Sequence, residues 1–363
     1  MKILIAMDSF KGSLTSRQAG NAARDGILRA CPDADVRVLP LADGGEGTLE
    51  AIAQFIEAEA ISCRVQGPLG DPVDSYYLGD HKTSTAYVEM AKASGITLVP
   101  DGMADVFHAS TYGTGELIRD AIDSGFQRIV VFLGGSATND GGMGMLSALG
   151  ARFLDRYGNP VPCCAAGLTD LYSIDTSGLA GKDITFIAAT DVTNPLCGRN
   201  GASHVYGPQK GATFEMAETM DGGLMNMAKI AGTDPDIPGS GAAGGMGFAL
   251  MHFLGASIES GADMVAKITG LEEAVRDCDI VITGEGRIDS QTINGKAPYR
   301  VMKIAAKHGR KTIGVCGITG EGWEKCLKAG FDLVVPLKEP SMEKDSAIIS
   351  LANTLTGLFA NNT

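Results

Sequence analysis

One ten-residue stretch, TGEGRIDSQT at positions 283–292, sets three charged side chains among glycines directly after the run DIVI. Arg287 has a planar guanidinium group that pairs well with a carboxylate or a phosphate. Asp289 and Glu285 are candidates for a general base or for the ligand of a divalent cation. An internal ion pair between Arg287 and one of these carboxylates is the structural alternative.

A second polar loop, DSFKGSLTS at positions 8–16, follows the first apolar run of the chain. It carries Asp8, Ser9, Lys11 and Ser13 just before an expected helix. Backbone amides and the helix dipole favour an anion at such a position. Capping of the helix accounts for Thr15, whereas Lys11 is a candidate for contact with a ligand.

Acidic residues follow two other expected strands. ADGGEGT contains Asp43 and Glu46 around two glycines, and ATDVTNPLCG contains Asp191. Asp43 and Glu46 either begin a helix or bind a metal ion or a hydroxyl group. Asp191 has the position of a metal ligand, although the Asn-Pro pair that follows also fits a plain turn.

Two glycine-rich segments are candidates for contact with phosphate oxygens, because glycine leaves backbone amides unshielded. GGSATNDGGMG begins at position 134 and follows a strand, whereas GSGAAG begins at position 239 and follows a segment that does not read as one. Neither is a Walker A loop, and GSGAAG lacks the strand that a dinucleotide fold requires. The candidate residues are Gly134, Gly135, Ser136, Gly241, Gly244 and Gly245.

Short apolar runs alternate with amphipathic segments at both ends of the chain, which predicts right-handed βαβ units and a parallel sheet. The predicted strands of these two blocks are 2–7, 36–39, 280–283, 312–316 and 332–337, and the predicted helices are 15–30, 47–58, 296–307 and 344–359. Neither block makes a full sheet alone. We therefore predict one discontinuous doubly wound α/β domain of flavodoxin-like strand order, formed by residues 1–66 and 271–363.

Residues 67–270 are predicted to form a second α/β domain inserted into the first, with strands near 75–78, 86–89, 129–133, 151–154 and 184–189. In a flavodoxin-like order, strands 2–7 and 280–283 are neighbours whose helices leave on opposite faces. Ligands bind beyond the carboxyl ends of such a strand pair. The loops at 8–16 and 283–292 are therefore expected to line one crevice.

Composition excludes several classes of partner. The formal net charge of −13 is unsuited to nucleic acid or an anionic membrane surface. The eight cysteines show no CxxC pair and the five histidines no HxH or HExxH pattern, which predicts a reduced, cytoplasmic protein without structural zinc. The amino terminus has too few apolar residues for a signal peptide. The uncharged segment 237–258 is long enough to span a membrane, but its six glycines, its proline and its histidine make it a poor lipid-facing helix.

The ordered set of motifs closely resembles the bacterial type I glycerate kinase family. The matching segments are DSFKGSLTS, LADGGEGT, GGSATNDGG, TDVTNPLCG, VYGPQKGA, GSGAAGGMG and TGEGRIDSQT. The resemblance spans about residues 2–358. It implies ATP-dependent phosphorylation of D-glycerate, with 2-phosphoglycerate as the product in enterobacterial-type members, and a flavodoxin-like domain with an inserted α/β domain.

Position and chemistry suggest a role for each candidate in such a kinase, where positioning and electrostatics dominate. Lys11 and Arg287 are expected to hold the glycerate carboxylate or the transferring phosphoryl group. Asp289 or Asp191 is expected to act as the base or as the Mg²⁺ ligand. The backbone amides of 134–136 and 241–245 are expected to face the phosphates of ATP.

Three alternatives remain open from the sequence. A glycerate 3-kinase would use the other hydroxyl group of the same substrate. A nicotinamide-dependent dehydrogenase acting on a hydroxy acid would use GSGAAG, and a sensor with two hinged lobes would bind a small molecule without catalysis. The sequence does not fix the oligomeric state, and a homodimer is compatible with it.

Overall fold

The first sheet of the protein is assembled from both ends of the chain. The computed structural model describes residues 1–360 and separates two compact units. Unit 1 comprises Met1–Asp43, Glu50–Phe55 and the described chain from Ala262 onward, and unit 2 comprises Gly44–Leu49 and Ile56–Gly261. Each unit has its own sheet and its own apolar core.

Unit 1 holds five strands in the order β13-β12-β11-β1-β2, and every neighbouring pair is parallel. This is the flavodoxin-like order, so the predicted fold class is confirmed. The strands are β1 (Lys2–Met7), β2 (Asp35–Val38), β11 (Ile280–Ile288), β12 (Lys311–Thr319) and β13 (Leu333–Pro336). The helices are α1 (Ser16–Ala30), α10 (Gly261–Thr269), α11 (Leu271–Arg276), α12 (Ala297–Lys307), α13 (Glu324–Ala329) and α14 (Lys344–Ala360), with the 3₁₀ turn η4 (Thr292–Asn294); the short α2 (Thr48–Ile52) lies at the boundary of the units.

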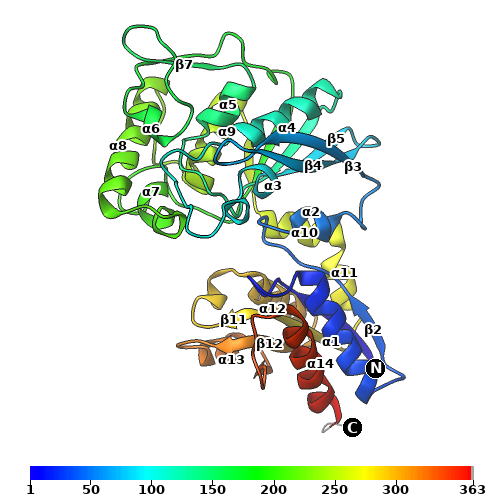
Figure 1. The fold of residues 1–363 in the computed structure, drawn as a ribbon. Helices are drawn as coiled ribbons and strands as arrows, with labels where there is room; N and C mark the ends of the chain where they lie inside the picture. Colours follow the sequence, from blue (N-terminus) through cyan, green and yellow to red (C-terminus); the bar gives the residue numbers. More distant parts are fainter. Residues whose placement is uncertain (361–363) are drawn as a thin grey trace. The chain divides into compact units, whose positions relative to one another are not determined.

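Helices cover both faces of this sheet because successive side chains of a strand point to opposite faces. Ile3 and Ile5 of β1 pack with the buried faces of α1 and α14, which lie side by side in Figure 1. Leu4 and Ala6 pack with α11 and α12 on the other face. Helix α1 begins at the predicted capping box, in which Thr15 accepts a hydrogen bond from the backbone of Gln18 and the Gln18 side chain accepts one in return.

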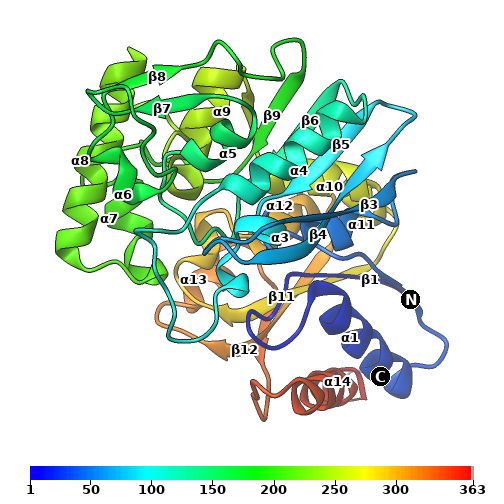
Figure 2. The ribbon, with the colours of Figure 1, turned by 45° about the horizontal axis from the view of Figure 1, so that its top comes forward.

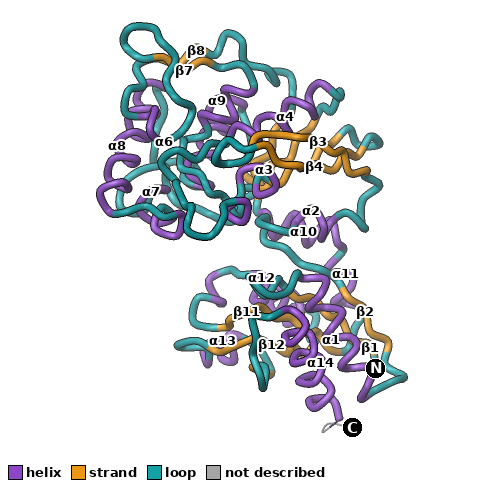
Figure 3. The backbone as a smooth tube through the Cα atoms, viewed as in Figure 1, coloured by secondary structure: helices purple, strands orange, loops and turns teal. Residues whose placement is uncertain are grey.

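Unit 2 has a six-stranded mixed sheet in the order β10-β9-β6-β5-β4-β3. Its strands are β3 (Glu59–Gln66), β4 (Pro72–Asp80), β5 (Thr85–Glu89), β6 (Arg128–Phe132), β9 (Thr185–Ala189) and β10 (Ser257–Glu259), with a separate antiparallel pair of β7 (Arg152–Leu154) and β8 (Ser173–Asp175). The helices are α3 (Ala91–Ser94), α4 (Tyr112–Asp123), α5 (Met143–Ala148), α6 (Ala165–Leu168), α7 (Ala202–Tyr206), α8 (Phe214–Ala231) and α9 (Met246–Leu254), with 3₁₀ turns η1 (Ile96–Leu98), η2 (Pro208–Lys210) and η3 (Ala242–Gly245). Helix α4 packs on β5 (Figure 2), and long loops join the short helices of this unit (Figure 3).

Two sequence expectations differ from the structure near the first boundary between the units. The helix predicted over 47–58 ends at Ile52, where a turn closes from the amide of Phe55 to the carbonyl of Ile52. The chain then forms β3, an edge strand paired antiparallel with β4, which the sequence analysis did not predict. Within residues 1–360, none of the helices combines the length and the apolar character that a membrane crossing requires.

Gly26 allows the close approach of α1 to α14. A Cβ atom there would lie 2.2 Å from the backbone oxygen of Ala352, which cannot move away as a flexible side chain would. We expect Gly26→Ala to lower the free energy of unfolding by about 1–3 kcal/mol through overpacking, despite the better helix propensity of alanine. Urea unfolding measures this change. The exposed Arg29→Ala on the same helix is the control, and equal stability of the two variants would refute the packing argument.

Candidate active site

The carboxyl ends of β1 and β11 meet at one edge of the sheet in unit 1. The register pairs Met7 with Gly284, and the amide of Asp8 donates to the carbonyl of Gly284 at 2.9 Å. This pairing brings Asp8 and Glu285 to the mouths of neighbouring strands. It is the switch point at which an open α/β sheet binds its ligand.

A cavity of about 630 Å³ lies at this edge, entirely within unit 1. Such a volume falls in the range of small-molecule binding sites. The polar lining consists of Asp8, Ser9, Lys11, Ser13, Asp43, Glu285, Arg287, Lys296 and Ser341. The cavity thus gathers five residues that the sequence suggested for substrate contact: Ser9, Lys11, Ser13, Asp43 and Arg287. Glu46, the sixth, is exposed in unit 2 and does not line this cavity.

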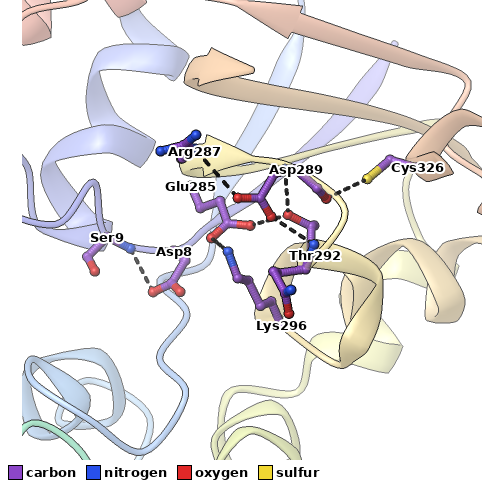
Figure 4. A network of polar contacts seen from close by, with 9 residues as sticks. Asp8, Ser9, Glu285, Arg287, Asp289, Thr292, Lys296 and Cys326 are labelled. Carbon is purple, nitrogen blue, oxygen red and sulfur yellow. Dashed lines mark hydrogen bonds and ion pairs between the residues drawn. The ribbon is translucent and has the colours of Figure 1, made fainter. Parts of the chain in front are cut away.

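Glu285 is held at both carboxylate oxygens. Its Oε1 accepts a hydrogen bond from Thr292 Oγ1 at 2.8 Å, and its Oε2 accepts one from Lys296 Nζ at 3.0 Å (Figure 4). Burial raises the pKa of Glu285, and the positive charge of Lys296 opposes that shift. The sequence motifs predict no role for Lys296 or Thr292, although both residues follow TGEGRID closely.

Arg287 forms the internal ion pair that was the structural alternative. Its Nε lies 3.6 Å from Asp289 Oδ2. The Arg287 side chain is nevertheless 61% exposed, and an exposed pair of this length contributes little stability. The guanidinium group therefore keeps surface available for a ligand. Asp289 lies outside the cavity lining, and its Oδ1 accepts a hydrogen bond from the amide of Gln291.

Asp8 is the first residue after β1. Its Oδ1 accepts a hydrogen bond from the amide of Ser9 at 2.7 Å. Burial, together with the nearby carboxylates of Asp43 and Glu285, raises the pKa of Asp8 to about 7, while the hydrogen bond and Lys11 oppose the shift. A carboxyl group with such a pKa is a functional candidate. The signal in the sequence was its place at a strand end.

The second candidate region is the glycine loop, residues 134–144, which follows β6 in unit 2. Gly135 is exposed and has a φ of +74°, a conformation that favours glycine. The amide of Gly134 donates to the carbonyl of Gly44. A buried lysine reaches this loop from η2: Lys210 Nζ donates to Ser136 Oγ and to the carbonyl of Thr138, each at 2.7 Å.

Asp140 anchors the far end of the glycine loop. It is fully buried and accepts hydrogen bonds from the backbone amides of Thr111, Gly142 and Gly144 and from the hydroxyl of Thr111. Burial raises the pKa of Asp140, and these four donors oppose the shift. The loop is therefore fixed before any ligand binds, as an anion-binding loop needs to be.

The predicted glycines of η3 occupy a different environment. Gly241, Gly244 and Gly245 are all buried. A Cβ at Gly241 would lie 2.1 Å from the carbonyl oxygen of Pro195, and one at Gly244 would lie 2.1 Å from that of Thr138. The amide of Gly241 donates to the carbonyl of Asn194. Close backbone packing accounts for these glycines, and their contact with a nucleotide stays a prediction.

Asp191 follows β9 directly, as the sequence suggested. Its carboxylate is exposed and its Oδ1 accepts a hydrogen bond from Ser260 Oγ at 2.6 Å. Within the described part of the chain, no three carboxylate, histidine or cysteine side chains are grouped so as to hold a metal ion. A Mg²⁺ ion in a phosphotransferase needs only one or two carboxylates, because substrate phosphates and water complete its shell. An exposed carboxylate at a strand end fits that requirement.

Comparison with known proteins gives a consistent result. The family model of the glycerate kinase family matches residues 3–362. The chain is 46% identical to the glycerate 2-kinase of Escherichia coli strain K12, over 92% of this chain and 90% of that one. It is 43% identical to the glycerate kinase of Halalkalibacterium halodurans, over 95% and 93%. A crystal structure of a protein provisionally assigned as glycerate kinase 2 from Salmonella typhimurium LT2 matches with a TM-score of 0.81 and 42% identity, covering 100% and 98% of the two chains.

The buried charge of Lys210 predicts a pH dependence of stability. Burial lowers the pKa of Lys210 from 10.5 to about 7. Between these values the unfolded chain binds the proton and the folded chain does not. The free energy of unfolding should therefore rise with pH, by up to about 1.4 kcal/mol per pH unit.

Lys210→Met removes the contribution of the Lys210 ammonium group to the pH dependence of stability. The difference in the free energy of unfolding between the native protein and Lys210→Met should grow in favour of the native protein from pH 7.5 to pH 9.5. Urea unfolding at several pH values measures it. The exposed Lys229→Met in α8 is the control, with a difference independent of pH. A flat difference for Lys210→Met would contradict the assignment of a lowered pKa.

Proposed function

The chain belongs to the glycerate kinase family, and we propose that it transfers the γ-phosphoryl group of ATP to the 2-hydroxyl of D-glycerate, giving 2-phosphoglycerate. The observation that carries this proposal is the cavity at the β1–β11 edge. It combines two cationic side chains, Lys11 and Arg287, with the carboxylates of Asp8 and Glu285. Cationic side chains such as Lys11 and Arg287 pair with the carboxylate of a small hydroxy acid. Phosphoryl transfer also needs a proton acceptor for the attacking hydroxyl group, which a carboxylate supplies.

The two cationic side chains are candidates for a carboxylate clamp. Lys11 and Arg287 both line the cavity and both are exposed at its surface. Arg287 supplies a planar fork, and Lys11 supplies a compact point charge. Lys296 is already paired with Glu285 at 3.0 Å, so it mainly offsets that carboxylate. A substrate carboxylate is therefore expected to bind at Lys11 and Arg287.

The glycine loop of unit 2 supports a role in binding the phosphates of ATP. Its exposed Gly135 and the neighbouring Gly134 and Ser136 lie in a loop that Lys210 and Asp140 hold in place. Such a loop suits phosphate oxygens, because its backbone dipoles need no rearrangement on binding. Bound Mg²⁺ would neutralise charge on the β- and γ-phosphates. Asp191 or Asp289 remains the proposed residue to hold it.

Regiochemistry is the finer part of the proposal. A clamp that fixes the carboxylate presents the 2-hydroxyl one carbon away and the 3-hydroxyl one bond further. The two oxygens differ by one or two ångströms in reach, and a misplacement of about 1 Å can cost 10²-fold in rate. The clamp should select one hydroxyl group strongly. Similarity to an enzyme named glycerate 2-kinase supports the 2-hydroxyl.

The dehydrogenase alternative has little support. GSGAAG is preceded by turns rather than by a strand, and its glycines pack against the protein's own backbone.

The eight cysteines are all free thiols, which supports the proposed cytoplasmic, reducing environment.

The proposed activity is tested by measuring ADP release with D-glycerate, L-glycerate and related three-carbon hydroxy acids. We expect ADP release with D-glycerate and a product whose proton NMR spectrum shows phosphorus coupling mainly to the single proton on carbon 2. Main coupling to the methylene protons, in an assay free of mutase, would identify a 3-kinase. Absence of ADP release with every acid would exclude the kinase proposal.

Arg287→Ala should impair the use of glycerate. The lost charge-assisted pair with the substrate carboxylate suggests a penalty of about 2–5 kcal/mol in kcat/KM if the pair is desolvated in the complex. Steady-state kinetics with glycerate and ATP varied separately should assign most of the loss to glycerate. Arg119→Ala, which removes an exposed arginine paired with Asp123, is the control. Unchanged glycerate KM and kcat in Arg287→Ala would rule out the clamp.

A further inference from the structure

We propose that Asp8 is the general base that accepts the proton of the attacking hydroxyl group. The proposal rests on the proposed kinase function and assigns a step within it. The sequence motifs suggest Asp289 or Asp191 for this role. The arrangement of the carboxylates in the cavity favours Asp8 instead.

Three carboxylates line the cavity, those of Asp8, Asp43 and Glu285. Both oxygens of Glu285 accept hydrogen bonds, from Thr292 and Lys296. Asp8 Oδ1 accepts one from Ser9, whereas Asp8 Oδ2 has no hydrogen-bond partner among the groups that the structure describes. Asp8 therefore offers an acceptor oxygen at the cavity wall that Glu285 lacks.

Asp289 is less suited to the role. It lies outside the cavity lining, its Oδ1 accepts from the amide of Gln291, and its Oδ2 faces Arg287. Both of its carboxylate oxygens therefore already have partners, and neither lies at the cavity wall. In Figure 4, Asp289 lies with Arg287 and Thr292, whereas Asp8 lies apart from that pair.

The peptide group between Met7 and Asp8 is held by hydrogen bonds from two neighbouring elements. Its amide donates to the carbonyl of Gly284. The carbonyl of Met7 accepts from Ser16 Oγ at 2.6 Å, and the same hydroxyl accepts from the amide of Leu41 at 2.8 Å. A general base must be held within hydrogen-bond reach of the proton it removes, and a strand end tied to α1 and to the next loop meets that need.

The charges around Asp8 also suit a base at neutral pH. The groups that face it are Asp43 and Glu285, which raise its pKa together with burial, and Lys11, which lowers it. The resulting pKa of about 7 is close to the working pH. A base with such a pKa combines a useful deprotonated fraction with a strong affinity for the proton.

The proposed reaction moves one proton and one phosphoryl group. With the substrate carboxylate at Lys11 and Arg287, the hydroxyl on the adjacent carbon gives its proton to Asp8 Oδ2. The hydroxyl oxygen forms a bond to the γ-phosphorus of ATP, and the bond from that phosphorus to the β,γ-bridging oxygen breaks. ADP leaves with that oxygen, and Asp8 later returns the proton to solvent.

Asp8→Asn tests the proposal, because it keeps the size of the side chain and removes its basicity. We expect kcat to fall by about 10²–10⁴-fold, while calorimetric binding of D-glycerate stays within about threefold of the native value. The native kcat/KM should rise with pH to a plateau above about 7, since the base must be deprotonated. The residual activity of Asp8→Asn should lack this rise. Asp25→Asn, an exposed acid on α1, is the control with native kinetics.

Asp43→Asn gives a second, independent readout. Removing a carboxylate that raises the pKa of Asp8 should move the inflection of the pH profile to lower pH. This measurement decides the matter if Asp8→Asn does not fold. An unmoved inflection in Asp43→Asn overturns the assignment. If Asp8→Asn folds, three results would also overturn the assignment: a pH profile that keeps its inflection, a near-native kcat, or loss of glycerate binding. A native protein that releases no ADP with any acid refutes the proposed function itself, a result separate from these.

Discussion

The pairing of β1 with β11 is the interaction on which the site in unit 1 depends. It joins segments that lie more than 270 positions apart, in the register Ile3–Ile280 through Met7–Gly284. At its last position the strands tolerate no side chain, because a Cβ at Gly284 would lie 2.0 Å from the carbonyl oxygen of Val315 in β12. Gly284 thus lets three strands close up at the edge where Asp8, Glu285 and Arg287 emerge. The first glycine of TGEGRID has a structural origin in this contact, whereas Gly286, Glu285 and Arg287 line the cavity.

The two units solve the problem of holding charge in different ways. In unit 1, Lys296 is partly exposed and pairs directly with Glu285, so each charge offsets the other. In unit 2, Lys210 is 3% exposed and donates to neutral oxygens of the glycine loop. Burying an ammonium group is costly, so the pKa of Lys210 falls to about 7. The gain is a loop whose amides are already oriented. Preorganised backbone dipoles are worth most where water is excluded.

Much of the architecture was predictable because it follows from local patterns. Alternation of apolar runs and amphipathic helices gave the parallel sheet of unit 1, and the doubly wound order then placed DSFKG beside TGEGRID. The strand β3 escaped prediction because it is an edge strand in which only Val65 is buried, so its apolar signal is weak. The burial of Lys210 also escaped, since its environment comes from Ser136 and Thr138, more than 70 positions away. Asp8 can be recognised in the sequence as an acid at the end of a strand. Only the structure shows that its Oδ2 has no hydrogen-bond partner among the described groups, whereas the oxygens of Glu285 and Asp289 have theirs.

The same strand pairing has a consequence for the order of events during synthesis. Strand β1 leaves the ribosome well before β11, which follows it by more than 270 positions in the chain. At 5–20 residues per second this delay is roughly 15–60 s. For that time Ile3, Leu4 and Ile5 have no β11 to pair with, while most of unit 2, which lies in the intervening chain, is already complete. Nascent chains of this topology therefore carry an apolar strand that holdase chaperones can bind, and a chain interrupted before β11 cannot form the edge that carries the cavity.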